Sequence, residues 1–100
     1  MAKVVFNRLF LANLKDILSY IDQDNSKHVA DQVETTIFDA IRLLEYFPLY
    51  GRIIYDSNGK EVLHSITVGC YLIIYSYTND TVFVEEIYDS RRDHRTKIQK

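Results

Sequence analysis

Apolar residues in the first quarter of the chain recur mostly three or four positions apart, which is the spacing of one face of an α-helix. Asn7 precedes them, and its side chain can accept a hydrogen bond from an N–H group of the first helical turn. We therefore predict a short strand over residues 3–6 and a helix over residues 8–23. The apolar face of this helix consists of Phe10, Leu14, Ile17, Leu18 and Ile21.

A second helical stripe follows the polar turn segment at residues 22–26. Ser26 is in position to cap its start. Pro48 is expected to end it, because the residue before a proline avoids the α region. Two helices with so short a link form an antiparallel hairpin, and each apolar face needs a packing partner. The second stripe consists of Val29, Ala30, Val33, Ile37, Ala40, Ile41, Leu44 and Phe47.

The second half of the chain contains strand-like runs separated by turn residues. The runs cover residues 51–56, 61–68, 71–78 and 81–89, and Asn58-Gly59 and Asn79-Asp80 have the composition of two-residue hairpin turns. Turns this short predict an antiparallel meander. We expect one α+β domain over residues 1–100, with a short N-terminal strand, then an antiparallel helical hairpin packed on an antiparallel β-sheet.

Composition narrows the range of functions. The chain of 100 residues carries a net charge of −2, so its overall field does not indicate a nucleic-acid partner. Cys70 is the single cysteine, which excludes an internal disulfide and a thiolate metal cluster. No apolar run is long enough to span a membrane. We expect a cytoplasmic protein, and we expect no cofactor.

The candidate chemical groups are sparse. The three histidines, His28, His64 and His94, lie in different predicted elements and lack metal-ligand spacing. The eight tyrosines suit a pleated sheet and could alternatively stack on bases. The acidic residues along the same strands favour packing, and Tyr71 and Tyr75 are expected in the core because they share one strand face.

Basic residues cluster after the last predicted strand, at Arg91, Arg92, Arg95, Lys97 and Lys100. The planar fork of donors on an arginine suits phosphate or carboxylate groups. A solvated tail and a binding surface explain this cluster equally well. Arg52 also allows two interpretations. It can form a surface ion pair, or it can present a cation beside the sheet as part of a site.

Residues in both helices and in the sheet together resemble the RelE/ParE toxin superfamily, and more closely its ParE-like branch. The resemblance spans nearly the whole chain. Its positions are Leu14, Ile17, Tyr20 and Ile21; Ser26, Ala30, Ile37, Ile41, Leu44, Phe47, Pro48, Gly51 and Arg52; and Tyr71, Ile73, Tyr75, Ile87, Arg91 and Arg92.

The resemblance implies the toxin of a type II toxin–antitoxin module. A ParE-like member is expected to inhibit growth by binding DNA gyrase, without being an enzyme, and to be neutralised by a cognate antitoxin that wraps it. Arg91, Arg92 and Arg95 are then the expected partner-binding residues. A homodimer is compatible with the pattern.

Two alternatives remain open from the sequence. The first is a ribosome-dependent mRNA endonuclease of the RelE type, with Arg52, Arg91, Arg92 and His94 around the scissile phosphate. No tyrosine follows Arg92, and the strand at 61–68 lacks the arginine common in the superfamily. The second alternative is a divergent, non-toxic member that retains only partner binding.

Overall fold

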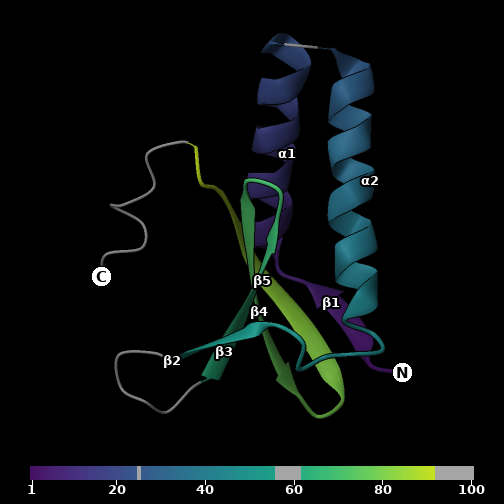
Figure 1. Cartoon of the computed structure of the whole chain (residues 1–100), viewed down its shortest axis with the longest axis vertical. Coiled ribbons are helices and arrows are strands. Elements are labelled where there is room, and N and C mark those ends of the chain that lie inside the picture. The colour runs from purple at the N-terminus through teal and green to yellow at the C-terminus, as the bar shows by residue number, and fades with distance from the viewer. Residues whose placement is uncertain (25, 56–61, 92–100) are drawn as a thin grey trace.

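The computed structural model describes residues 1–24, 26–55 and 62–91, and these residues form two helices and five strands in the predicted order (Figure 1). The predicted Asn58-Gly59 turn and the basic residues after Arg91 lie outside this range. The elements are β1 (Lys3–Phe6), α1 (Arg8–Asp24), α2 (Lys27–Leu43), β2 (Arg52–Tyr55), β3 (Val62–Val68), β4 (Tyr71–Thr78) and β5 (Thr81–Asp89).

Both helices begin at the predicted caps. The Asn7 side-chain oxygen accepts a hydrogen bond from the Leu9 N–H group at 2.8 Å. The Ser26 hydroxyl oxygen accepts one from the Val29 N–H group at 3.2 Å. Each bond satisfies a backbone donor that has no partner within the first helical turn.

The end of α2 differs from the prediction. The helix stops at Leu43, and Phe47, which we placed in its apolar stripe, is 61% exposed. The Leu44 N–H group bonds to the Ile41 carbonyl at 2.9 Å, so the last turn is tightened, and the Glu45 carbonyl accepts the Ala2 N–H group at 2.7 Å. This contact and the restriction before Pro48 turn the chain out of the helix before it reaches Phe47.

The strands form one sheet in the order β1-β5-β4-β3-β2. The predicted meander is confirmed for β2 to β5, and Asn79 and Asp80 make the β4–β5 turn with positive φ values of 51° and 58°. The sheet is not wholly antiparallel, because β1 pairs parallel to β5 with Val4 opposite Val82. Parallel pairing needs a long connection, and the helical hairpin begins that connection directly after β1.

The core lies on the sheet face covered by the helices. Three alternate residues of β4, Tyr71, Ile73 and Tyr75, are buried there, as predicted. Phe10 and Ile37 pack from the helices and are fully buried. Figure 1 shows α1 and α2 side by side, extending beyond one end of the sheet. Neither of these described helices is long and apolar enough to cross a membrane.

Candidate partner-binding site

The end of β5 is tied to the start of β4. Asp89 lies opposite Tyr71 in the strand register. The following residue, Ser90, places both its N–H and its hydroxyl on the Cys70 carbonyl, at 2.8 and 2.7 Å. These bonds fix where the chain leaves the sheet, and they bring Arg91 over the Tyr71 ring.

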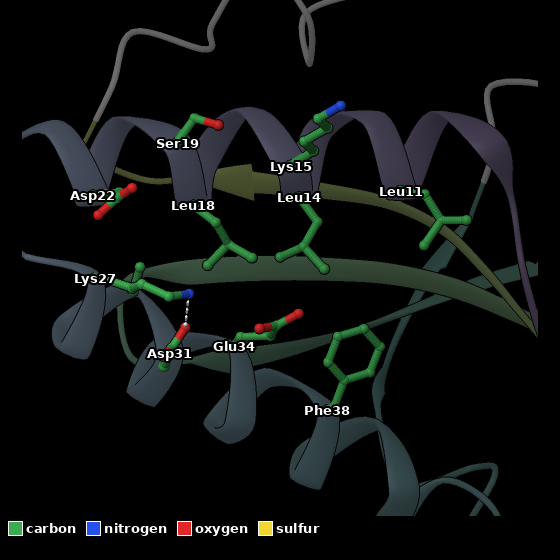
Figure 2. Close-up of a pocket in the computed structure, with 11 residues that line it drawn as sticks. Leu11, Leu14, Lys15, Leu18, Ser19, Asp22, Lys27, Asp31, Glu34 and Phe38 are labelled. Atoms are coloured by element: carbon green, nitrogen blue, oxygen red, sulfur yellow. Dashed lines mark ion pairs between the residues drawn. The ribbon is translucent and has the colours of Figure 1, made fainter.

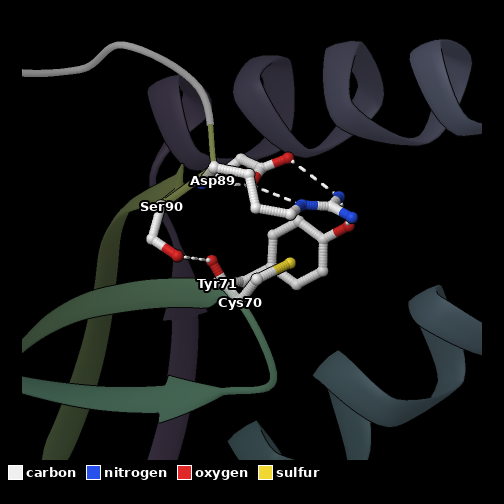
Figure 3. Close-up of polar contacts among 5 residues, drawn as sticks. Cys70, Tyr71, Asp89 and Ser90 are labelled. Atoms are coloured by element: carbon white, nitrogen blue, oxygen red, sulfur yellow. Dashed lines mark hydrogen bonds and ion pairs between the residues drawn. The ribbon is translucent and has the colours of Figure 1, made fainter.

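Arg91 forms a compact polar cluster with Asp89 and Tyr71 (Figure 3). Its Nε and Nη2 atoms donate to the two carboxylate oxygens of Asp89 at 3.2 and 3.1 Å, and Nη2 also donates to the Tyr71 hydroxyl at 3.1 Å. The guanidinium carbon lies 5.7 Å from the Tyr71 ring centre. A buried acid is thus joined to a base whose side chain is 60% exposed.

The electrostatics of this cluster follow from burial and proximity. Burial raises the pKa of the Tyr71 hydroxyl to about 12, above its usual value near 10. The hydrogen bonds from Arg91 to Asp89 raise the pKa of the Arg91 guanidinium. Near neutral pH the site therefore presents a neutral phenol and a permanent cation.

An apolar groove of about 290 Å³ lies beside the cluster, between α2 and the turn from β3 to β4. Arg91 stands among its lining residues. Such a groove can take apolar side chains of a partner while the cation meets an acidic or carbonyl group. It is lined by Val29, Gln32, Val33, Thr36, Ile37, Val68, Gly69, Cys70, Tyr71 and Arg91.

A second groove, of about 410 Å³, lies between the two helices (Figure 2). Leu11, Leu18 and Phe38 contribute apolar surface to it. Lys27 and Asp31 form an ion pair of 3.5 Å in its wall, and both side chains are exposed. An exposed ion pair of this kind contributes less than about 1 kcal/mol to protein stability. The packing of α1 against α2 therefore contributes most to the position of these two helices.

In the middle of β4, Tyr75 fixes the linker between α2 and β2. Its hydroxyl donates to the Pro48 carbonyl at 2.8 Å and accepts the Gly51 N–H group at 2.9 Å. A Cβ atom on Gly51 would lie 2.6 Å from this hydroxyl and 2.8 Å from the Ser65 carbonyl oxygen. Pro48 and Gly51, which carry part of the resemblance, therefore have structural roles here.

A family model described as "ParE toxin of type II toxin-antitoxin system, parDE" matches residues 4–94. The chain belongs to the ParE toxin family. The predicted family and its ParE-like branch are thereby confirmed.

Solved structures support the fold of this ParE-family chain. A chain of the "Chromosomal ParDE TA system from P. aeruginosa" superposes with a TM-score of 0.73 and 13% identity, covering 89% of this chain and 96% of that one. No protein with a curated description matches. At this identity the structural likeness establishes the α+β fold, and the family match establishes the toxin–antitoxin class.

The structure describes two of the predicted cations of this ParE-family chain, Arg52 and Arg91, and it does not bring these two together. Arg52 lies in β2 opposite Ser65, on the sheet edge remote from β5, whereas Arg91 follows β5 and covers Tyr71 on the helix side. Three strand spacings of about 4.8 Å separate the two strands. Arg92, Arg95 and His94 lie outside the described residues.

The histidines show no catalytic or metal-binding arrangement in the part of the chain that the structure describes. His28 is exposed on α2, and His64 is buried in β3, stacked on Tyr75 with ring centres 5.1 Å apart. No group of three potential metal ligands occurs among the described residues. His64 is thus a packing residue.

Sequence reasoning missed the residues that anchor Arg91. Asp89 and Tyr71 belong to neighbouring strands, and only the register of β4 with β5 places them together. One local signal was available in the sequence, since an arginine at a strand end can bond to an acid two positions before it. The Arg91 N–H group indeed donates to the Asp89 carboxylate at 2.9 Å.

Proposed function

We propose that this member of the ParE toxin family inhibits growth by binding DNA gyrase in the cytoplasm, and that a cognate antitoxin neutralises it. The observation that carries the proposal is the family match across residues 4–94. The toxin acts as a binding inhibitor and uses no cofactor. Its described site supports this reading, because Arg91 and its neutral phenol partner offer recognition without acid–base chemistry.

We assign partner binding to the basic end of the chain, at Arg91, Arg92 and Arg95, together with the groove beside it. The α2 side of the groove combines the apolar Val29, Val33 and Ile37 with two polar residues, and Arg91 adds a cation to its lining. This chemistry suits an amphipathic segment that carries an acid beside its apolar side chains. An antitoxin segment of that kind would cover the groove and neutralise Arg91.

The first experiment separates a toxin from a non-toxic binding module. Induced expression of the chain should arrest growth, and co-expression of an antitoxin gene from the same operon should restore it. Purified protein should then slow supercoiling by gyrase or trap cleaved DNA. Normal growth under strong expression would favour the non-toxic alternative, and unaffected gyrase at saturating protein would remove gyrase as the target.

Arg91 provides the site-specific test. Arg91→Gln removes the cation at the groove and should weaken partner binding about tenfold, as expected for loss of one charge-assisted contact of about 1.4 kcal/mol. Arg42→Gln is the matched control, because Arg42 is an exposed arginine at the end of α2. Calorimetry should measure both affinities, after circular dichroism has verified the fold. Equal effects of the two variants would contradict the assignment.

The mRNA endonuclease is the other outcome of these tests. It requires Arg52, Arg91, Arg92 and His94 to meet at one phosphate, and the separation of Arg52 from Arg91 favours the binding inhibitor over it. Translating extracts decide the matter directly. Ribosome-dependent cleavage of mRNA that His94→Ala abolishes would establish the endonuclease, whereas intact mRNA together with inhibited gyrase would establish the binding inhibitor.

A further inference from the structure

Exposed apolar side chains concentrate on the linker between α2 and β2. Among the described residues, twelve large apolar side chains are exposed, and six of them lie between positions 43 and 53. Their exposed fractions run from 51% to 73%. Such clustering exceeds the scattered exposure that is normal on a protein surface. We call this set the linker patch: Leu43, Tyr46, Phe47, Leu49, Tyr50 and Ile53.

The backbone beneath the linker patch is fixed. Tyr75 from the core holds the Pro48 carbonyl and the Gly51 N–H group, and the Tyr50 N–H group bonds to the Phe47 carbonyl at 3.0 Å. The linker therefore turns these two backbone groups inward, while the side chains of the linker patch stay exposed. A surface held in this way loses little conformational entropy when it binds.

The area of the linker patch suits an interface between two identical chains. Aromatic side chains carry about 150–250 Å² each, so the three exposed aromatic residues, with the three aliphatic ones, offer about 600 Å² in all. Two such patches facing one another would bury about 1,200 Å², which reaches the lower range of specific interfaces. The enrichment in tyrosine and phenylalanine is typical of interface cores.

The charges that flank the linker patch complement one another between copies. Glu45 stands at one end of the linker and Arg52 at the other, and neither side chain pairs with another described residue. A twofold axis near Pro48 would run two linkers antiparallel and set Glu45 of each copy against Arg52 of the other. Each copy therefore carries both signs of charge at the borders of the patch, as contacts between two identical chains require.

We propose that the linker patch is a homodimer interface, in which two copies of this chain pack their linkers antiparallel. Strand β2 borders the patch and ends the strand order, so its outer edge pairs with no described strand. The dimer would cover Ile53 and shield this edge. The proposal concerns self-association alone, so it stands whether or not gyrase is the target.

The test is the mass of the purified chain across a concentration series, measured by sedimentation velocity. The wild-type chain should pass reversibly from monomer to dimer. Leu49→Asp should weaken dimerisation at least tenfold, because it puts a charge at the centre of the interface. Leu9→Asp is the matched control on α1, where the leucine is also exposed, and it should leave the dimer unchanged.

Charge reversal tests the antiparallel arrangement. Glu45→Arg should weaken the dimer by placing like charges together, and the double change Glu45→Arg with Arg52→Glu should restore it. Three results would overturn the proposal: a monomer at every concentration, a dimer that persists in Leu49→Asp, or equal loss in Leu9→Asp. A monomer whose linker patch becomes protected from hydrogen exchange only in the antitoxin complex would instead assign the patch to the antitoxin.

Discussion

Tyr71 and Tyr75 lie four residues apart on the same face of β4, and both are buried, yet their hydroxyls are held by different kinds of partner. Tyr75 bonds to two backbone groups of the linker, at Pro48 and Gly51. Tyr71 accepts from Arg91, a charged side chain that is largely exposed. The start of β4 is thus held by an ion-pair cluster, and its middle by neutral backbone contacts.

The contacts of Tyr75 therefore serve the stability of the fold, whereas the contact between Tyr71 and Arg91 can adapt to a partner. Backbone contacts under the linker respond little to salt, whereas an exposed guanidinium responds to ionic strength and to an approaching partner. A binding surface benefits from the second kind of contact, because Arg91 can exchange part of its bonding to Asp89 for a ligand. The free energy of unfolding should therefore depend more on the contacts of Tyr75, and partner binding more on the contacts around Tyr71.

Gly51→Ala should have the largest effect on stability. The new Cβ atom would lie 2.8 Å from the Ser65 carbonyl oxygen, which belongs to a strand and cannot easily move. We expect a loss of about 2–3 kcal/mol in the free energy of unfolding, measured by urea denaturation. Gly69→Ala meets no atom within 4 Å but has a positive φ of 61°, so a loss limited to about 1–2 kcal/mol is expected there. An equal or larger loss at Gly69 would refute the steric argument.

Tyr75→Phe should cost more than Tyr71→Phe. The first change leaves two backbone groups without their hydroxyl partner, and we expect a loss of about 1–2 kcal/mol. The second removes one bond from a guanidinium that keeps Asp89, so a loss below about 1 kcal/mol is expected. Chemical denaturation at pH 7 measures both. A larger loss in Tyr71→Phe would show that the charged cluster contributes more to stability than the contacts of Tyr75 with the linker.

The free energy of unfolding should show almost no effect of Tyr71 ionisation at neutral pH and a growing loss above pH 10. The Tyr71 pKa is raised to about 12, so the folded state retains a proton that the unfolded chain releases near pH 10. This contribution is complete below pH 10 and falls by roughly 2–3 kcal/mol as pH approaches 12. Denaturation midpoints from pH 8 to pH 11.5 should therefore fall less steeply in Tyr71→Phe. The control is Tyr20→Phe, at an exposed site on α1 outside the linker patch, and a slope unchanged in Tyr71→Phe would contradict the assignment.

The sequence pattern predicted what depends on local spacing. Helix starts at Asn7 and Ser26, the Asn79-Asp80 turn and the burial of Tyr71 and Tyr75 all follow from cap chemistry and from periods of 3.6 or 2. These features need only a few neighbouring residues, so the sequence contains the information for them.

Features that depend on distant contacts were missed. The early end of α2 involves the Ala2 N–H group bonding to Glu45, and the parallel pairing of β1 involves β5 at the far end of the chain. The partners of Arg91 depend in the same way on strand register. Arg91 could therefore be named from the sequence as a candidate binding residue, whereas its partners Asp89 and Tyr71 and the groove beside it could not.

The pairing of β1 with β5 has a consequence for how the protein is made. Lys3 lies opposite Thr81, so β1 can join the sheet only after β5 has been synthesised. Helical hairpins form quickly from local contacts, but this closure joins the two ends of the chain and comes late. A nascent or truncated chain that lacks β5 would therefore keep β1 without its partner strand.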